Sequence, residues 1–129
     1  MRVVIVEDNA IYKEELINCM NQEAEAVDIV GITDNGAEGL AVIEKVRPDV
    51  VFTDIRMPEM DGFEMIEAIR RKHIFCKFVV VSSCPEFVYA KRAMQLGVSD
   101  YLLKPVKLSE IRMVLRRLEE ELRERDRWV

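Results

Sequence analysis

Short runs of β-branched residues alternate with helix-patterned segments along the whole chain, and this alternation limits the possible folds more than any other feature. The runs are continuously apolar, as in VVFTD, which is typical of strands buried on both faces of a parallel sheet. Segments with apolar residues three or four apart follow them, as expected of helices with one buried face. The expected strands are 2–7, 27–33, 49–54, 77–83 and 99–104, and the expected helices are 9–23, 36–46, 62–72, 85–96 and 108–126.

Strands that alternate with helices predict an α/β fold, with helices covering both faces of the sheet. Right-handed crossovers leave few arrangements of five parallel strands. The common small one is the doubly wound, flavodoxin-like sheet with strand order 2-1-3-4-5. In such sheets ligands bind beyond the carboxyl ends of the strands, where the strand order reverses.

Composition excludes several classes of protein. The net charge of -5 argues against a surface built for nucleic acid or for membranes. Three cysteines without a C-x-x-C pair do not form a disulfide framework, which favours a reducing cytoplasm. We expect no membrane span, because no apolar run approaches the roughly 20 residues needed to cross a bilayer. The chain opens directly on the strand-like MRVVIVED, so we expect no signal peptide.

Polar residues stand at the carboxyl ends of the predicted strands: Glu7 and Asp8, Asp54, Ser82 and Lys104. In the predicted strand order the three carboxylates converge, and they repel one another unless a cation lies among them. Without histidine or cysteine the ligands are hard oxygens, which selects Mg²⁺ or Mn²⁺ over zinc or copper. An aspartate carboxylate can attack phosphorus, and a lysine and a serine can stabilise the remaining phosphoryl oxygens.

Purely structural interpretations exist for several of these positions. Glu7 and Asp8 are also consistent with an N-cap of the first helix. Asp61 with Gly62 is interpreted as a turn and helix start without chemistry. Pro85 suits the first turn of the fourth helix and Ser83 its N-cap, while Gly97 suits its C-terminal end.

Four motifs occur in order from Val3 to about Leu118: VVIVEDN, VVFTDIRMPEMDGFEMI, FVVVSS and VSDYLLKPV. Together they resemble the receiver domain of two-component response regulators. The resemblance implies a receiver domain over residues 1–122, with 123–129 as the end of the last helix or the start of a linker to an output domain. EFVYAKRAMQLGVSDYLLKPV is similar to receivers that are fused to AraC-type DNA-binding domains.

The resemblance also implies a role for each site residue. Asp54 would be the phosphorylated residue, and Glu7 and Asp8 the acidic pair that holds Mg²⁺ with it. The backbone carbonyl of Arg56 would be a further metal ligand. The other implied roles are those of Ser82 and Tyr101 as switch residues, Lys104 as partner of the phosphoryl group, and Pro105 after a cis peptide bond. Tyr101 is also consistent with an ordinary half-buried strand residue.

By this resemblance the chain is a phosphorylation switch rather than an enzyme in its own right. A sensor histidine kinase would phosphorylate Asp54. The face made of helix 85–96, strand 99–104 and helix 108–126 would then dimerise and control an output, with DNA contacted only through an attached domain. Because neither Arg56 nor Cys84 orients an attacking water well, we expect slow self-dephosphorylation.

Two other functions compete with the switch. A Mg²⁺-dependent phosphohydrolase would also use Asp54 as nucleophile, but such enzymes commonly carry an acid/base carboxylate where this chain has Arg56. A nucleotide binder needs a phosphate-cradling loop after the first strand, and EDNAIYKE contains no glycine.

The last helix carries apolar residues in a heptad-like 3-4-3-4 spacing. Packing against the sheet explains the first part of this seam. Its end, within the charged RRLEEELRERDRW, is consistent with packing or with an extension into a dimer or a linker. The seam consists of Leu108, Ile111, Leu115, Leu118 and Leu122.

Overall fold

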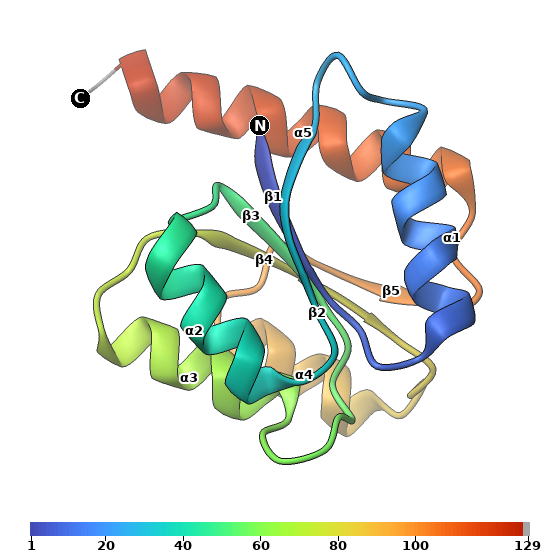
Figure 1. The fold of residues 1–129 in the computed structure, drawn as a ribbon, viewed down its shortest axis with the longest axis vertical. Helices are drawn as coiled ribbons and strands as arrows, with labels where there is room; N and C mark the ends of the chain where they lie inside the picture. Colours follow the sequence, from blue (N-terminus) through green and yellow to red (C-terminus); the bar gives the residue numbers. More distant parts are fainter. Residues whose placement is uncertain (128–129) are drawn as a thin grey trace.

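The computed structural model describes residues 1–127, which form one parallel sheet with the strand order β2-β1-β3-β4-β5 (Figure 1). This confirms the predicted fold class and strand order. The strands are β1 (Arg2–Val6), β2 (Asp28–Thr33), β3 (Val50–Thr53), β4 (Lys77–Ser82) and β5 (Asp100–Leu103). The helices are α1 (Ala10–Asn21), α2 (Gly36–Val46), α3 (Gly62–Arg71), α4 (Phe87–Gln95) and α5 (Leu108–Arg127).

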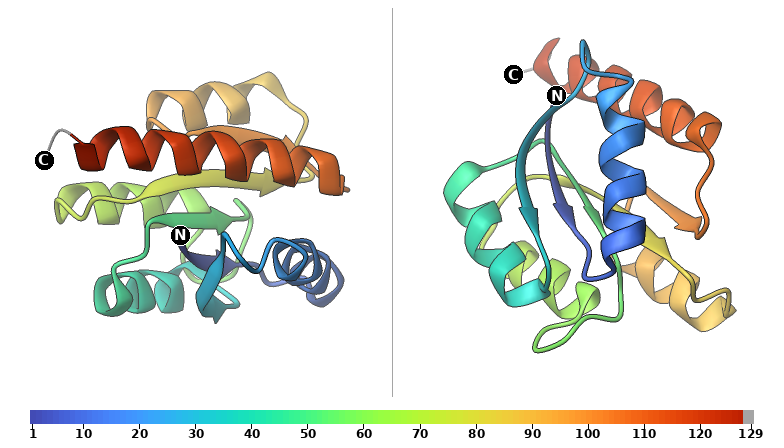
Figure 2. Two further views of the ribbon diagram at one scale, coloured as in Figure 1. Left: turned by 90° about the horizontal axis from the view of Figure 1, so that it is seen from above. Right: turned by 45° about the vertical axis from the view of Figure 1, so that its right-hand side comes forward.

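The helices form a layer on each face of the sheet (Figure 2). On one face α1 and α5 pack against alternate strand residues such as Val50 and Phe52. On the other face α2, α3 and α4 pack against the residues in between, such as Val51 and Val80. Successive side chains of a strand point to opposite faces, so both sets are apolar where both faces are covered. This explains why the central strands are continuous hydrophobic runs.

The start of α4 differs from the prediction. The helix begins at Phe87, with Glu86 as an N-cap residue that makes no side-chain capping hydrogen bond. Pro85 therefore precedes the helix, and Ser83 is not its cap. The reason lies at the end of β4, where the Cys84 N–H donates to the Ser82 hydroxyl oxygen and holds the chain outside the helix. At the other end Gly97 has a φ of 74°, as expected for a residue that ends a helix.

The end of the hydrophobic seam in α5 packs inside the domain. Leu118 is fully buried and Leu122 is 9% exposed, so packing against the sheet explains the seam as far as Leu122. Residues 123–127 continue the helix. Residues 128 and 129, the remainder of the predicted helix end or linker, lie outside the described residues.

Gly62 lies where the loop after β3 enters α3. Its N–H donates to the Ile55 carbonyl over 2.8 Å, and a Cβ atom built on it would lie 2.1 Å from the Asp54 carbonyl oxygen. Asp61 and Glu64 form a reciprocal capping box around this helix start, so the backbone has little freedom to move away. The sequence identified this turn, and the structure shows that it supports the backbone of Asp54.

Replacing Gly62 by alanine is therefore expected to lower the free energy of unfolding by about 2 kcal/mol, since backbone must shift to make room. Urea denaturation of the purified variant measures the change. Gly97→Ala is the matched control. Its Cβ would meet only the Arg70 side chain, at an ordinary contact distance of 3.9 Å, so the positive φ alone should cost stability, about 1 kcal/mol. Equal losses in the two variants would contradict the steric explanation.

Candidate functional site

Three carboxylates meet at the carboxyl ends of β1 and β3. These strands are neighbours, with Val6 paired to Thr53, so the residues that follow them lie side by side. Glu7, Asp8 and Asp54 each offer an oxygen, and these oxygens lie within 4.8 Å of one another. Glu7 is fully buried and Asp54 is 9% exposed, whereas Asp8 is exposed. The cluster is thus buried on one side and open to solvent at Asp8.

Lys104, which follows β5, supplies the positive charge of this cluster. Its Nζ lies 2.8 Å from Asp54 Oδ2 and 2.6 Å from Glu7 Oε1, and its side chain is only 3% exposed. Burial acts to lower the pKa of Lys104, but the hydrogen bonds and charges of Asp54 and Glu7 outweigh it, and the pKa is raised. The Lys104–Pro105 peptide bond is cis.

The pKa of Glu7 is raised to about 7, because burial disfavours the charged carboxylate more than its neighbours favour it. Lys104 and the Asn9 N–H act in the opposite direction, while the negative charge of Asp54 adds to the rise. The carboxyl group of Glu7 therefore gains or loses its proton near neutral pH.

The hydrogen bonds of the carboxylates leave one acceptor incomplete. Asp54 Oδ1 accepts from the Ile55 N–H over 2.7 Å, and Glu7 Oε2 accepts from the Asn9 N–H over 3.1 Å. Glu7 Oε1 is buried, and its one close polar contact is the Lys104 ammonium at 2.6 Å. A buried carboxylate oxygen with a single contact, beside two other carboxylates, suits a hard divalent cation such as Mg²⁺ or Mn²⁺.

The two predicted switch residues meet at the backbone of Cys84. Ser82 is the last residue of β4 and is buried, and its Oγ accepts from the Cys84 N–H over 3.0 Å. Tyr101 is half-buried in β5, and its hydroxyl donates to the Cys84 carbonyl over 2.6 Å. Burial raises the pKa of Tyr101 above its ordinary value. Both residues thus contact the same short segment after β4.

Arg56 lies two residues after Asp54, in the loop between β3 and α3. Its side chain is exposed and its guanidinium donates to the Tyr89 hydroxyl over 2.7 Å, which links the loop to α4. No carboxylate therefore occupies the position that a hydrolytic acid/base would need.

Sequence reasoning missed two residues beside the cluster. Asn9 is the N-cap of α1, accepting from the Ile11 and Tyr12 N–H groups, so the capping role considered for Glu7 and Asp8 belongs to their neighbour. The ring of Tyr12 lies under the Lys104 ammonium, with 4.3 Å from Nζ to the ring centroid. The only signal in the sequence was the position of Tyr12 in the first turn after the acidic pair.

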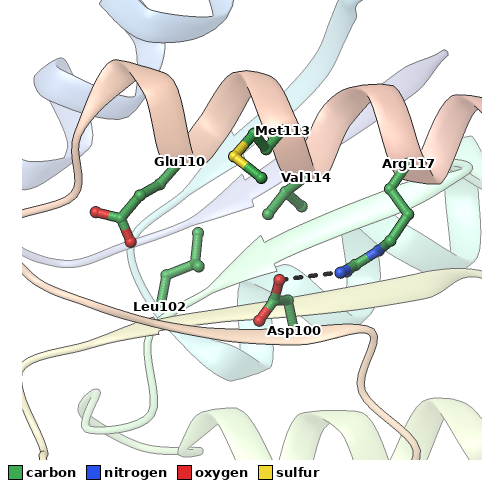
Figure 3. A pocket seen from close by; sticks show the side chains of 6 residues that line it. All are labelled: Asp100, Leu102, Glu110, Met113, Val114 and Arg117. Carbon is green, nitrogen blue, oxygen red and sulfur yellow. Dashed lines mark hydrogen bonds and ion pairs between the residues drawn. The ribbon is translucent and has the colours of Figure 1, made fainter.

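A pocket lies apart from the acidic cluster, between β5 and α5 (Figure 3). Arg117 of α5 faces Asp100 of β5 across it, with 3.3 Å between Nη2 and Oδ2. Leu102 and Val114 contribute apolar surface, and Met113 is among the exposed apolar side chains of α5. The pocket lies on the face for which the resemblance to receiver domains implies a signalling role.

Comparisons with known proteins agree with this geometry. The family model for the response regulator receiver domain matches residues 3–116. The uncharacterized transcriptional regulatory protein YesN of Bacillus subtilis is 33% identical over 97% of this chain and 34% of its own length. The transcriptional regulatory protein BtsR of Escherichia coli K12 is 34% identical over 98% of this chain and 51% of its own length. The chain thus spans about half the length of BtsR and about a third of the length of YesN.

Solved structures show the same relationship. The receiver (REC) domain of AraT, a response regulator from Geobacillus stearothermophilus, has a TM-score of 0.88 and 33% identity, over 97% of each chain. The signal receiver domain of the response regulator NarL from Mycobacterium tuberculosis has a TM-score of 0.84 and 31% identity, over 92% of this chain and 95% of its own. The chain belongs to the response regulator receiver domain family.

Within residues 1–127, every helix is too short or too polar to cross a membrane.

Proposed function

We propose that this receiver domain accepts a phosphoryl group on Asp54 from the phosphohistidine of a sensor histidine kinase, in the presence of Mg²⁺. The observation that carries the proposal is the ion pairing of Lys104 with both Glu7 and Asp54 at the edge of an acidic cluster. This arrangement combines a carboxylate nucleophile, a cation for the incoming phosphoryl oxygens and oxygen ligands for a metal.

Each residue of the cluster would have a separate role in phosphoryl transfer. Asp8, Asp54 and the backbone carbonyl of Arg56 would hold Mg²⁺ with Glu7 beside them, and the bound ion would neutralise charge between the carboxylate and the phosphoryl group. An Asp54 oxygen attacks phosphorus, so that an O–P bond forms while the N–P bond to the donor imidazole breaks. Lys104 pairs with one phosphoryl oxygen, and the Ser82 hydroxyl donates to another.

The output face lies in α4, β5 and α5. Movement of Ser82 towards the phosphoryl group would make room for Tyr101 and change this face, which then dimerises. Large exposed apolar side chains of these three elements could pack against a partner on this face. They are Phe87, Val88, Met94, Leu103 and Met113. A bias of a few kcal/mol between two conformations is enough to invert their populations.

The whole protein would be a cytoplasmic regulator of transcription. BtsR and YesN are transcriptional regulatory proteins that extend well beyond the region they share with this chain. We infer that the receiver ends near Leu122 and that DNA is contacted through an attached domain, of the AraC type, rather than by this one. The net charge of -5 supports a receiver without its own nucleic-acid surface.

Incubation with Mg²⁺ and acetyl phosphate, followed by intact mass spectrometry, tests the proposal. We expect one added phosphoryl group, no adduct when EDTA is present, slow loss after the donor is removed, and a larger species on a sizing column. Continuous release of inorganic phosphate without an adduct would contradict the switch and favour the Asp54 phosphohydrolase.

Mg²⁺ affinity is expected to fall as the pH is lowered through the pKa of Glu7, about 7. Below that pH the carboxyl group holds a proton and the cluster carries one negative charge less, so Mg²⁺ affinity should fall, by at most about tenfold per pH unit. Calorimetric titrations between pH 8 and pH 6 measure the change. Glu7→Gln cannot titrate at this position, so it should bind Mg²⁺ more weakly than the wild type at pH 8 and show no such change with pH. A wild-type Mg²⁺ affinity that stays constant from pH 8 to pH 6 would contradict this role of Glu7.

A further inference from the structure

Three groups surround the Lys104 ammonium, and the proposed mechanism uses only two of them. Asp54 Oδ2 and Glu7 Oε1 are its carboxylate partners. The third is the ring of Tyr12, whose centroid lies 4.3 Å from Nζ. The face of an aromatic ring carries negative potential and attracts a cation at this distance. Since the Lys104 side chain is only 3% exposed, water screens this attraction little.

The segment that supplies the acidic pair also fixes the backbone that carries the ring. The Asn9 N–H donates to Glu7 Oε2, and Asn9 Oδ1 accepts from the Tyr12 N–H over 3.1 Å. Tyr12 therefore occupies a capped first turn of α1. At the far side of the site the Lys104 N–H donates to the Ser82 carbonyl over 2.9 Å, which anchors the backbone of the lysine. Both ends of the ring–ammonium contact are thus held by hydrogen bonds of their backbones.

From this geometry we infer that Tyr12 is a positioning residue, which holds the Lys104 ammonium in the site while it exchanges a carboxylate partner for a phosphoryl oxygen. The inference rests on the proposed function. Lysine is flexible, and its conformational freedom must be restricted before it can act. A carboxylate restricts it only until the new oxygen arrives. The ring is uncharged and takes no part in the exchange, so it can hold the ammonium before and after transfer.

Tyr12→Leu and Tyr12→Phe form the matched pair of variants, because only the first removes the ring. We expect Tyr12→Leu to take up phosphoryl groups from acetyl phosphate about fivefold more slowly than the wild type. Tyr12→Phe should react at the wild-type rate. Ile11→Ala, at an exposed position in the same helical turn, controls for general effects on the start of α1. Equal rates for Tyr12→Leu and wild type would overturn the inference.

NMR of the Lys104 ε-methylene protons gives a second readout that needs no phosphorylation. The ring should shift these protons upfield in the wild type and in Tyr12→Phe, and the shift should vanish in Tyr12→Leu. A rate loss without this change in shift would mean that the effect is merely structural and would also overturn the inference. A wild type that takes up no phosphoryl group would overturn the proposed function itself, whereas a reactive wild type matched by Tyr12→Leu overturns only the role of Tyr12.

Discussion

The Asp54→Asn variant is expected to take up no phosphoryl group from acetyl phosphate under conditions that label the wild type. An amide oxygen is far less nucleophilic than a carboxylate oxygen, so the O–P bond cannot form at a useful rate. Asparagine has the same shape and keeps an oxygen to accept from the Ile55 N–H, so the variant should remain folded. Intact mass spectrometry with Mg²⁺ present measures the adduct, and circular dichroism checks the fold.

Asp28→Asn is the matched control for this loss. Asp28 is an exposed residue on β2, at the opposite end of the strand from the acidic cluster. The same change in charge there should leave phosphoryl uptake at the wild-type level. An adduct that persists in Asp54→Asn would show that another residue is the acceptor.

Lys104→Met is expected to lower the free energy of unfolding of the metal-free protein by about 3 kcal/mol at pH 8, the usual consequence of removing one partner of a buried ion pair. Without the ammonium, Glu7 and Asp54 would be buried carboxylates facing each other and Asp8. The loss should be smaller at pH 6. The pKa of Glu7 is already raised from 4.5 to about 7 in the folded protein, and losing Lys104 raises it further.

The sign of this dependence follows from the protonation of Glu7. The pKa of Glu7 is 4.5 in the unfolded chain and about 7 in the folded protein. As the pH rises from 4.5 towards 7, the unfolded chain therefore loses the Glu7 proton while the folded protein keeps it, and the free energy of unfolding falls. Urea denaturation at pH 6 and pH 8 without Mg²⁺ measures the effect, and added Mg²⁺ should restore part of the stability. Lys107→Met, at an exposed position three residues away, should change little. Equal losses at both pH values would contradict this role of Glu7.

Much of the fold could be predicted because its signals are local. The continuous β-branched runs identified strands with both faces covered, and the glycine after α4 marked the end of that helix. The start of α4 could not be predicted in this way. Pro85 is a helix-start signal, but the contact between Cys84 and the Ser82 hydroxyl holds it outside the helix. A hydrogen bond formed by the last residue of a strand overrides the local preference.

The acidic cluster could be predicted because parallel strands carry their carboxyl ends to one edge. The sequence could not predict two other contacts. They are the contact of Lys104 with the Tyr12 ring and the hydrogen bond from Arg56 to Tyr89. Each joins side chains from different elements, and whether a long side chain reaches its partner depends on how the helix packs on the sheet. The strand ends thus predict the outline of the site, and the packing of the helices on the sheet adds these contacts to it.

The central claim is that Asp54 carries the phosphoryl group. Treatment of the phosphorylated protein with borohydride converts an aspartyl phosphate into homoserine, and mass spectrometry of the peptides then locates the altered residue. We predict homoserine at position 54 alone, and none when Mg²⁺ or the phosphodonor is omitted. Homoserine at another aspartate, or a phosphorylated protein without homoserine at position 54, would contradict the account.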